Sequence, residues 1–396
     1  MAQQHTKESV QNPTPPKELL RIDVREKYRD GFFHEWEGEN IHSFHRFTPA
    51  PDPGAVRMTF IRSIDTANPM ARVIESTDGG ENWAEIPGWH PPAILGIYEH
   101  KGRRMAILGG TRVSVSDDGI AWTDIKVPNA EITQYEELSV PNTFSAIKMV
   151  TGHRAGRIVM VASYFTGEEG PDCEIVSSTY SDNWGVTWHG SRLFAPPPPL
   201  PHIAEGFGEP SVVEMPSGWL WMVFRTEYGE LWQTMSRDGG MNWVKATPSG
   251  FVSPIANCAT MREPTTGATV LCWNAAQPGT DTDFHKVGLY RPRNNLCFAV
   301  SHDNTRTWTE PVVIDAGEAQ YPTIHFAAGR MFIMYQNSPS MEADWGDMGL
   351  TVVAYDTKEI LQLPAWTHET IKPWIDRGLI RHWRASACQI NRQTIS

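Results

Sequence analysis

The chain has 396 residues, a formal net charge of −12 and 16 tryptophans. Because no basic stripe accompanies this acidic balance, the composition argues against a nucleic-acid partner and indicates only a well-solvated surface. The 32 glycines and 30 prolines punctuate many short segments without low-complexity runs, which is typical of a folded chain with many turns rather than a disordered one.

The N-terminal segment, residues 1–20, is polar and contains prolines. It has no apolar stretch of the kind that forms the core of a signal peptide. No apolar run elsewhere is long enough to cross a membrane as a helix. We therefore expect no signal peptide and no membrane partner, and we favour a cytoplasmic location.

The cysteines are odd in number and show neither a CxxC pair nor a Cys/His metal spacing. They are Cys173, Cys258, Cys272, Cys297 and Cys388. This usage predicts free core thiols and no metal site.

Five segments repeat the pattern Ser-x-Asp-x-Gly-x-x-Trp, with some positions changed. They span residues 76–83, 115–122, 181–188, 236–243 and 301–308. The second has Val115 at the serine position, the third has Asn183 at the aspartate position and the fifth has Thr305 at the glycine position. Repetition of this kind is the sequence signature of a repeat architecture.

The chemistry of the repeat suits a tight hairpin. The Asp carboxylate can accept hydrogen bonds from nearby backbone amides and so close the turn. Gly accepts the positive φ that the turn requires, and the Trp ring packs back into the core. We therefore interpret the repeat, an Asp box, as structural and not catalytic.

Strand-like segments precede each box, at residues 70–75, 111–115, 174–180, 231–235 and 296–300. The boxes recur about every 40 to 65 residues, which is the length of a four-stranded propeller blade with variable loops. Five boxes imply at least five blades, and the chain ends supply a sixth, with residues 36–47 and 349–355 as candidate closing strands. Helical periodicity occurs only near residues 357–380.

The sequence thus predicts an all-β fold, a six-bladed β-propeller with Asp-box hairpins and a short C-terminal helical segment. We assign residues 1–25 to an N-terminal extension and 26–396 to a single propeller domain.

One stretch carries a family resemblance beyond the boxes. It begins Glu209-Pro210-Ser-Val-Val-Glu214, continues to Arg225 and runs on into the fourth box. Together with the boxes it resembles the sialidase (neuraminidase) superfamily of BNR-repeat propellers, over roughly residues 40–340. The resemblance implies a site at the centre of a sialidase-type propeller.

In that family, three arginines hold the carboxylate of an acidic sugar, an Asp acts as general acid, and a Tyr assisted by a Glu is the nucleophile. A neutral phenol avoids the repulsion that a carboxylate nucleophile would meet beside the sugar carboxylate. Carried over, this scheme makes Tyr321 the nucleophile, Glu209 its base, Asp65 the acid, and Arg46, Arg225 and Arg291 the clamp. Arg293 is the alternative to Arg291, and Asn274 is a candidate donor to a sugar hydroxyl.

The first blade departs from the family pattern. The family has Arg-Ile-Pro where this chain has His45-Arg46-Phe47-Thr48-Pro49. Nothing around Asp65 is diagnostic. These departures leave the sugar open.

Three functions follow from these residues. The first is an exo-acting, retaining glycoside hydrolase that cleaves a terminal acidic sugar. The second is a polysaccharide lyase or related glycosidase on uronic-acid-containing glycans, in which a His or Tyr is the base and His45 or His202 could act as acid or base. The third is a non-catalytic glycan-binding propeller, for which the candidate site residues would not converge. In each case the expected partner is an acidic sugar or glycan, with no cofactor, and the oligomeric state stays open.

Overall fold

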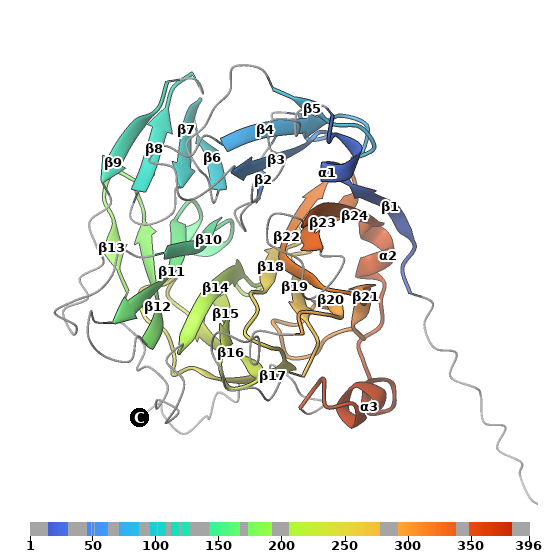
Figure 1. The fold of residues 1–396 in the computed structure, drawn as a ribbon. Helices are drawn as coiled ribbons and strands as arrows, with labels where there is room; N and C mark the ends of the chain where they lie inside the picture. Colours follow the sequence, from blue (N-terminus) through green and yellow to red (C-terminus); the bar gives the residue numbers. More distant parts are fainter. Residues whose placement is uncertain are drawn as a thin grey trace, which may run out of the picture.

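The computed structural model describes most of the chain and leaves several connecting loops and both ends outside the description. The described residues are 15–30, 46–48, 50, 52–61, 71–86, 96–100, 102–107, 112–118, 121–126, 142–166, 173–191, 206–277, 292–337 and 348–381. Six four-stranded antiparallel sheets stand around a common centre (Figure 1). The prediction of a six-bladed propeller is confirmed.

Each of the first five blades uses four strands that are consecutive in the chain. The first contains β2 (Arg46–Thr48), β3 (Val56–Ile61), β4 (Ala71–Ser76) and β5 (Ala84–Glu85), and the second β6 (Gly96–His100), β7 (Arg103–Ile107), β8 (Arg112–Ser116) and β9 (Thr123–Lys126). The third contains β10 (Asn142–Lys148), β11 (Ile158–Thr166), β12 (Cys173–Ser181) and β13 (His189–Gly190), with the 3-10 turn Gly152–Arg154 between its first two strands. The fourth contains β14 (Phe207–Glu214), β15 (Leu220–Thr226), β16 (Glu230–Ser236) and β17 (Thr247–Val252). The fifth contains β18 (Ala259–Arg262), β19 (Thr269–Asn274), β20 (Leu296–Ser301) and β21 (Val312–Asp315).

The sixth blade joins the two ends of the chain. It contains β22 (Ala319–Ala327), β23 (Arg330–Asn337), β24 (Gly349–Asp356) and, on its outer edge, β1 (Glu18–Asp23), which pairs with β24. The closing strand predicted at 349–355 is confirmed within β24. Its partner comes from the segment that we assigned to the N-terminal extension. Of the other candidate, 36–47, only residues 46 and 47 are described, and they lie in β2 of the first blade.

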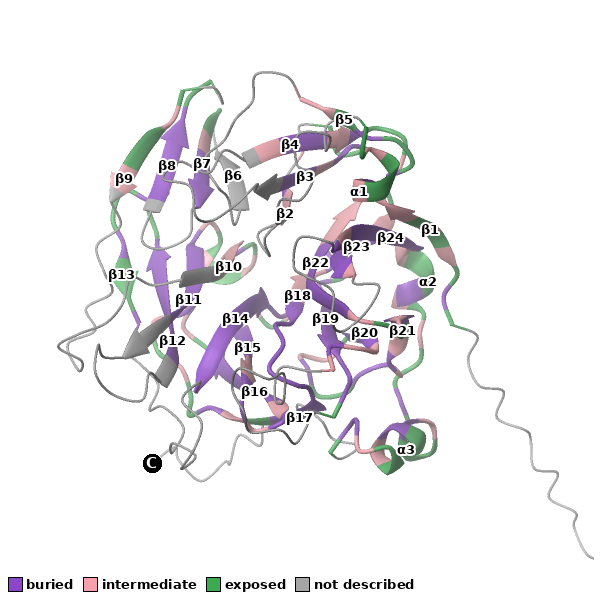
Figure 2. Cartoon of the chain, in the orientation of Figure 1, coloured by how far each residue is buried: buried purple, intermediate pink, exposed green. Residues whose placement is uncertain are grey.

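One edge strand of each sheet faces the centre, and in the sixth blade this strand is β22. Each inner strand contacts the next around the ring, from β2 through β6, β10, β14, β18 and β22, and β22 contacts β2 again. The inner strand β14 is buried along its whole length (Figure 2). Side chains at the central ends of these strands can therefore meet although they are distant in sequence.

The Asp boxes form hairpin turns as predicted. In the fourth box, Asp238 Oδ1 accepts hydrogen bonds from the backbone amides of Met241 at 3.1 Å and Asn242 at 2.9 Å. Ser236 Oγ accepts from the amide of Gly240 at 2.8 Å, and Gly240 has a φ of 89°. These bonds join residues three or four apart, so the box closes its own turn.

The second box lies one residue later than the sequence alignment placed it. Ser116 Oγ donates to Asp118 Oδ1 at 3.0 Å, and the amide of Ala121 donates to the same oxygen at 2.8 Å. The serine that we considered lost is therefore present as Ser116. Counting the box backwards from Trp122 placed its serine position at residue 115. In this turn one residue fewer separates the serine from the tryptophan than in the other boxes.

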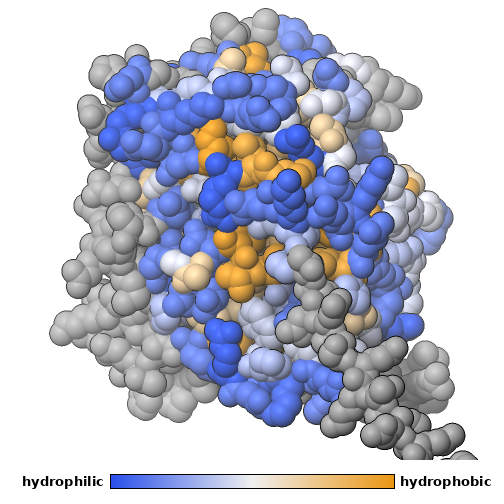
Figure 3. All heavy atoms as spheres, turned by 90° about the vertical axis from the view of Figure 1, so that its right-hand side faces the viewer, coloured by the Kyte–Doolittle hydropathy of each residue, from blue (hydrophilic) through white to orange (hydrophobic). Residues whose placement is uncertain are grey.

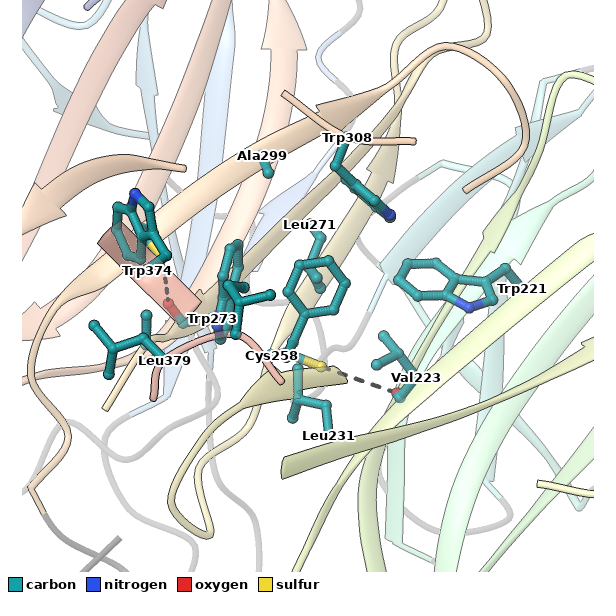
Figure 4. Close-up of a cluster of buried hydrophobic side chains, with 14 of the residues drawn as sticks. Trp221, Val223, Leu231, Cys258, Leu271, Trp273, Ala299, Trp308, Trp374 and Leu379 are labelled. Atoms are coloured by element: carbon teal, nitrogen blue, oxygen red, sulfur yellow. Dashed lines mark hydrogen bonds between the residues drawn. The ribbon is translucent and has the colours of Figure 1, made fainter. Parts of the chain in front are cut away.

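A large aromatic core lies between the fourth and fifth blades and the C-terminal helix α3 (His368–Asp376). The preceding helix α2 (Thr357–Leu361) packs through Ile360 on the core of the fifth and sixth blades. The rings of Trp221 and Trp308 lie 5.6 Å apart, and those of Phe251 and Trp273 lie 4.8 Å apart. Trp374 reaches the same cluster from α3 (Figure 4). The predicted C-terminal helical segment is thus confirmed, and it seals the outer side of two blades.

The surface on the side of the N-terminal strand is mainly hydrophilic, with apolar areas between hydrophilic bands (Figure 3). Cys258, Cys272 and Cys297 are free and buried, and burial raises the pKa of each thiol. Cys388 and the side chain of Cys173 lie outside the described residues. In the part of the chain that the structure describes, no helix combines the length and apolar character needed to cross a membrane.

Candidate active site

Two inner strands carry the same distortion at the centre of the propeller. The pairing of β14 with β15 shifts between Gly208 and Ser211, and that of β22 with β23 shifts between Gln320 and Thr323. The bulged residues are Glu209, with φ 44°, and Tyr321, with φ 53°. Positive φ is uncommon outside glycine, and bulges and strained residues concentrate at functional sites.

The sequence carries a signal for this distortion that was missed at the sequence level. Glu209 and Tyr321 each precede a proline inside a strand, Pro210 and Pro322. Proline cannot donate to the ladder of a central strand, so it marks a bulge or an edge. The same irregularity therefore presents a carboxylate from one blade and a phenol from another.

Glu209 forms a buried ion pair with Arg225. Gly208 pairs in register with Arg225 on β15, which brings the arginine beside the bulge. Arg225 Nη1 lies 3.2 Å from Glu209 Oε2, and the two side chains are 11% and 8% exposed. Because a buried charge without compensation is costly, the opposite charges of these two groups compensate each other.

Arg293 lies against Tyr321 at the boundary of the fifth and sixth blades. Its guanidinium carbon is 5.4 Å from the centroid of the tyrosine ring. Nη1 donates to Gln320 Oε1 at 2.5 Å, and Nη2 donates to the backbone oxygen of Ile255 at 2.9 Å. These contacts hold a buried guanidinium beside the phenol.

Arg46 completes the cluster from the first blade. Its residue is only partly buried, but its guanidinium is enclosed by protein, and this burial lowers its pKa to about 10. Electrostatic interaction with Glu209, and to a smaller extent with Tyr321, opposes that shift in the pKa of Arg46. Arg46 therefore lies within electrostatic range of both residues, and it still carries its charge at neutral pH.

The structure thus brings together five residues named from the sequence. They are Arg46, Glu209, Arg225, Arg293 and Tyr321. Asp65, Arg291, His45 and His202 lie outside the described residues. For the third arginine we favoured Arg291, whereas the guanidinium that the structure places beside Tyr321 is that of Arg293.

We expected the Asn274 amide to donate to a sugar hydroxyl, but in the structure it donates to backbone oxygens. Its Nδ2 donates to the backbone oxygens of Arg293 at 2.9 Å, Asn294 at 3.3 Å and Ala319 at 2.8 Å. The residue is fully buried. These three carbonyls take up the hydrogens that we expected to reach a sugar.

Sequence reasoning also missed Gln320 and Ile255, which hold Arg293. Gln320 stands beside Tyr321 in the sequence and could have been suspected. Ile255 contributes a backbone oxygen from the loop between β17 and β18, for which no sequence pattern exists.

The cluster combines three guanidinium groups, one carboxylate and one phenol. Guanidinium groups form paired hydrogen bonds with planar anions such as carboxylates. A phenol with an adjacent carboxylate can act as a nucleophile with its base. Among the described residues, no group of three or more His, Cys, Asp or Glu side chains is arranged to hold a metal ion.

Comparison with solved structures shows the same fold at low sequence identity. A protein of unknown function from Dyadobacter fermentans is 16% identical, with a TM-score of 0.60 over 86% of this chain and 98% of that one. The Hadza microbial sialidase Hz136 is also 16% identical, with a TM-score of 0.55 over 80% of this chain and 66% of that one. The leech intramolecular trans-sialidase is 14% identical, with a TM-score of 0.55 over 82% of this chain and 69% of that one.

No curated protein matches the sequence. The model of one protein family, the BNR repeat-like domain, matches residues 104–334. That span covers more than half of the chain and includes four of the five Asp boxes. The chain therefore belongs to the BNR repeat-like domain family, on a six-bladed sialidase-type propeller.

Proposed function

We propose that this protein is an exo-acting glycoside hydrolase that removes a terminal sugar bearing a carboxylate, with retention of configuration. The observation that carries the proposal is the convergence of Arg46, Arg225 and Arg293 on Glu209 and Tyr321, from four different blades. A non-catalytic propeller has no need to bury a phenol and a carboxylate within a cluster of guanidinium groups. Solved sialidases of the same fold support this choice.

In the first step, Arg46, Arg225 and Arg293 hold the sugar carboxylate. The Tyr321 oxygen attacks the anomeric carbon while the bond to the leaving oxygen breaks. Glu209 accepts the phenol proton, and the leaving oxygen receives a proton from a general acid. Asp65 is our candidate for that acid on the family resemblance alone.

In the second step, water attacks the anomeric carbon and the bond to Tyr321 breaks. The phenol recovers its proton, and the water loses one to the group that acted as acid. Two displacements on one carbon restore the starting configuration. The Arg293 charge beside the Tyr321 ring stabilises the phenolate character that develops in each step.

The test is a panel of acidic glycosides, assayed in parallel for released sugar and for the ultraviolet absorbance of an unsaturated product. We expect hydrolysis of at least one terminal acidic glycoside without an unsaturated product. Absorbance from an unsaturated uronic acid would instead identify a lyase.

Tyr321→Phe removes the nucleophile and keeps the ring. We expect it to lower kcat on the order of 10³-fold or more, because loss of a covalent nucleophile removes most of the catalysis. Tyr335→Phe is a control, since Tyr335 lies in β23 and its hydroxyl contacts Arg21 and Asp315. Full activity in Tyr321→Phe would refute the proposed mechanism.

A further inference from the structure

Asn274 ends the second strand of the fifth blade, and its amide nitrogen bridges two segments of the chain. Nδ2 donates to the backbone oxygen of Arg293, at 2.9 Å, and to that of Ala319, at 2.8 Å. Arg293 belongs to the loop before β20 in the fifth blade, and Ala319 is the first residue of β22 in the sixth. A single side chain therefore joins two blades.

The two bridged segments are those that carry Arg293 and Tyr321. Backbone bonding reinforces the bridge, since the amide of Ala319 donates to the oxygen of Arg293 at 2.9 Å. Arg293 in turn contacts Gln320 and the ring of Tyr321 through its guanidinium. The backbone separation that Asn274 fixes therefore sets the placement of the guanidinium against the phenol.

Tyr321 depends on such an anchor because the ladder on its own strand is interrupted. The pairing of β22 with β23 shifts between Gln320 and Thr323, and Tyr321 has a positive φ. A residue held in a sparsely populated conformation persists only when its surroundings fix it. Asn274 provides a fixed point two residues before Tyr321.

The other end of the Asn274 amide supports a role as donor. Its Oδ1 is buried, and it has no hydrogen-bond partner among the described residues. A buried acceptor without a partner is unfavourable. The contribution of the side chain therefore comes from the hydrogens on its nitrogen, which aspartate at neutral pH or a hydrocarbon could not supply.

We propose that Asn274 is a positioning residue that fixes Arg293 against Tyr321 across the boundary of the fifth and sixth blades. The catalytic consequence rests on the proposed function, whereas the mechanical consequence does not. If Asn274 is lost, the two segments can separate, and small displacements of reacting groups cost large factors in rate.

The mechanical test is hydrogen–deuterium exchange of Asn274→Asp, which keeps the shape of the side chain and removes its donors. The matched control is Asn295→Asp. Asn295 lies in the loop that carries Arg293, and within the described part of the chain its Nδ2 donates one long bond, to Ala275 O at 3.4 Å. We expect peptides covering residues 317–323 to exchange at least ten-fold faster in Asn274→Asp, with peptides 207–213 unchanged. Unaltered exchange at 317–323, or equal acceleration in the control, would overturn the proposal. If Asn274→Asp does not fold, Asn274→Ser replaces it with the same expectations.

The catalytic test uses a glycoside that the panel identifies as a substrate. We expect Asn274→Asp to lower kcat/KM at least ten-fold and Asn295→Asp to lower it less than two-fold. In an Arg293→Lys background, Asn274→Asp should lower kcat/KM less than three-fold, because Asn274 acts through the arginine that is already altered. Fully additive losses would contradict the positioning role. If no glycoside is hydrolysed, the proposed function fails by itself, and the exchange experiment still decides the role of Asn274.

Discussion

Arg157 joins two neighbouring Asp boxes and offers a sharp test of how the blades are held together. Its Nε and Nη2 donate to the two carboxylate oxygens of Asp182, each at 2.7 Å, in the third box. Its Nη1 donates to the backbone oxygens of Asp238 at 3.1 Å and Gly239 at 2.9 Å, in the fourth box. Its guanidinium also lies 4.1 Å from the centroid of the Tyr180 ring.

Arg157→Met removes these contacts and keeps most of the apolar stem. The side chain of Arg157 is 3% exposed, whereas that of Asp182 is 56% exposed, so the carboxylate left behind is solvated. The lost bonds to the buried Gly239 carbonyl and the partly buried Asp238 carbonyl cost about 1 kcal/mol each. The half-solvated ion pair and the ring contact add about 1 kcal/mol each. We expect a loss of about 3 to 4 kcal/mol in the free energy of unfolding.

The assay is urea unfolding followed by tryptophan fluorescence, with Lys372→Met as the control. Lys372 also forms an ion pair, with Asp376 one helical turn away, but those side chains are 58% and 57% exposed. Such a pair contributes only about 0.3 to 0.5 kcal/mol. If Arg157→Met and Lys372→Met lower the free energy of unfolding by the same small amount, the inter-blade bonds of Arg157 do not stabilise the ring.

Three further predictions concern the site, the boxes and the closing strand. Glu209→Gln keeps the size of the side chain but removes the base, and we expect kcat on the identified glycoside to fall by about 10² to 10⁴. The melting temperature should also fall, because Arg225 loses its buried counter-charge. Unchanged kcat in the folded variant would exclude Glu209 as base. Hydrogen bonds from the backbone and side chain of Asn82 and from Ser76 lower the pKa of Asp78 to about 2, so its stabilising contribution is present above the unfolded pKa of about 4 and is lost as pH falls toward 2. Asp78→Asn should therefore lower the urea midpoint at pH 7 more than at pH 2.5, and an equal decrease at both would contradict the assignment. Arg21→Met removes the hydrogen bonds that join β1 to Tyr335 OH and to the backbone oxygen of Ile314, both at 2.7 Å. Because β1 pairs with β24, hydrogen exchange of residues 349–356 should become faster while residues 207–213 stay protected.

The Asp boxes could be read from the sequence because their bonds are local. Each carboxylate and hydroxyl closes its own hairpin through amides two to four residues away, as at Ser236 and Asp238. The spacing of the boxes then predicted a ring of blades. Even here, the one-residue shift of the second box to Ser116 and Asp118 needed coordinates. A turn one residue shorter leaves the spacing to the tryptophan ambiguous.

The candidate site was predictable only where the family resemblance extended. Glu209, Arg225 and Tyr321 stand in segments that resemble the family, and the structure brings them to one cluster with Arg46. The choice of Arg293, by contrast, depended on where a loop of the fifth blade meets the first residues of the sixth. The periodicity of a sequence does not predict a contact between loops of two different blades.

The sequence alone determined the elements that residues close in sequence can specify: the turns, the number of blades and the C-terminal helices. Tertiary structure alone decided which strand pairs with β24, that Arg293 lies against the phenol and what Asn274 binds. Strand β1 pairs with β24 across more than 300 residues, and Asn274 bonds to carbonyls 19 and 45 residues away. Contacts of this kind exist only once the blades have packed side by side, because packing supplies the partner that the local chain lacks.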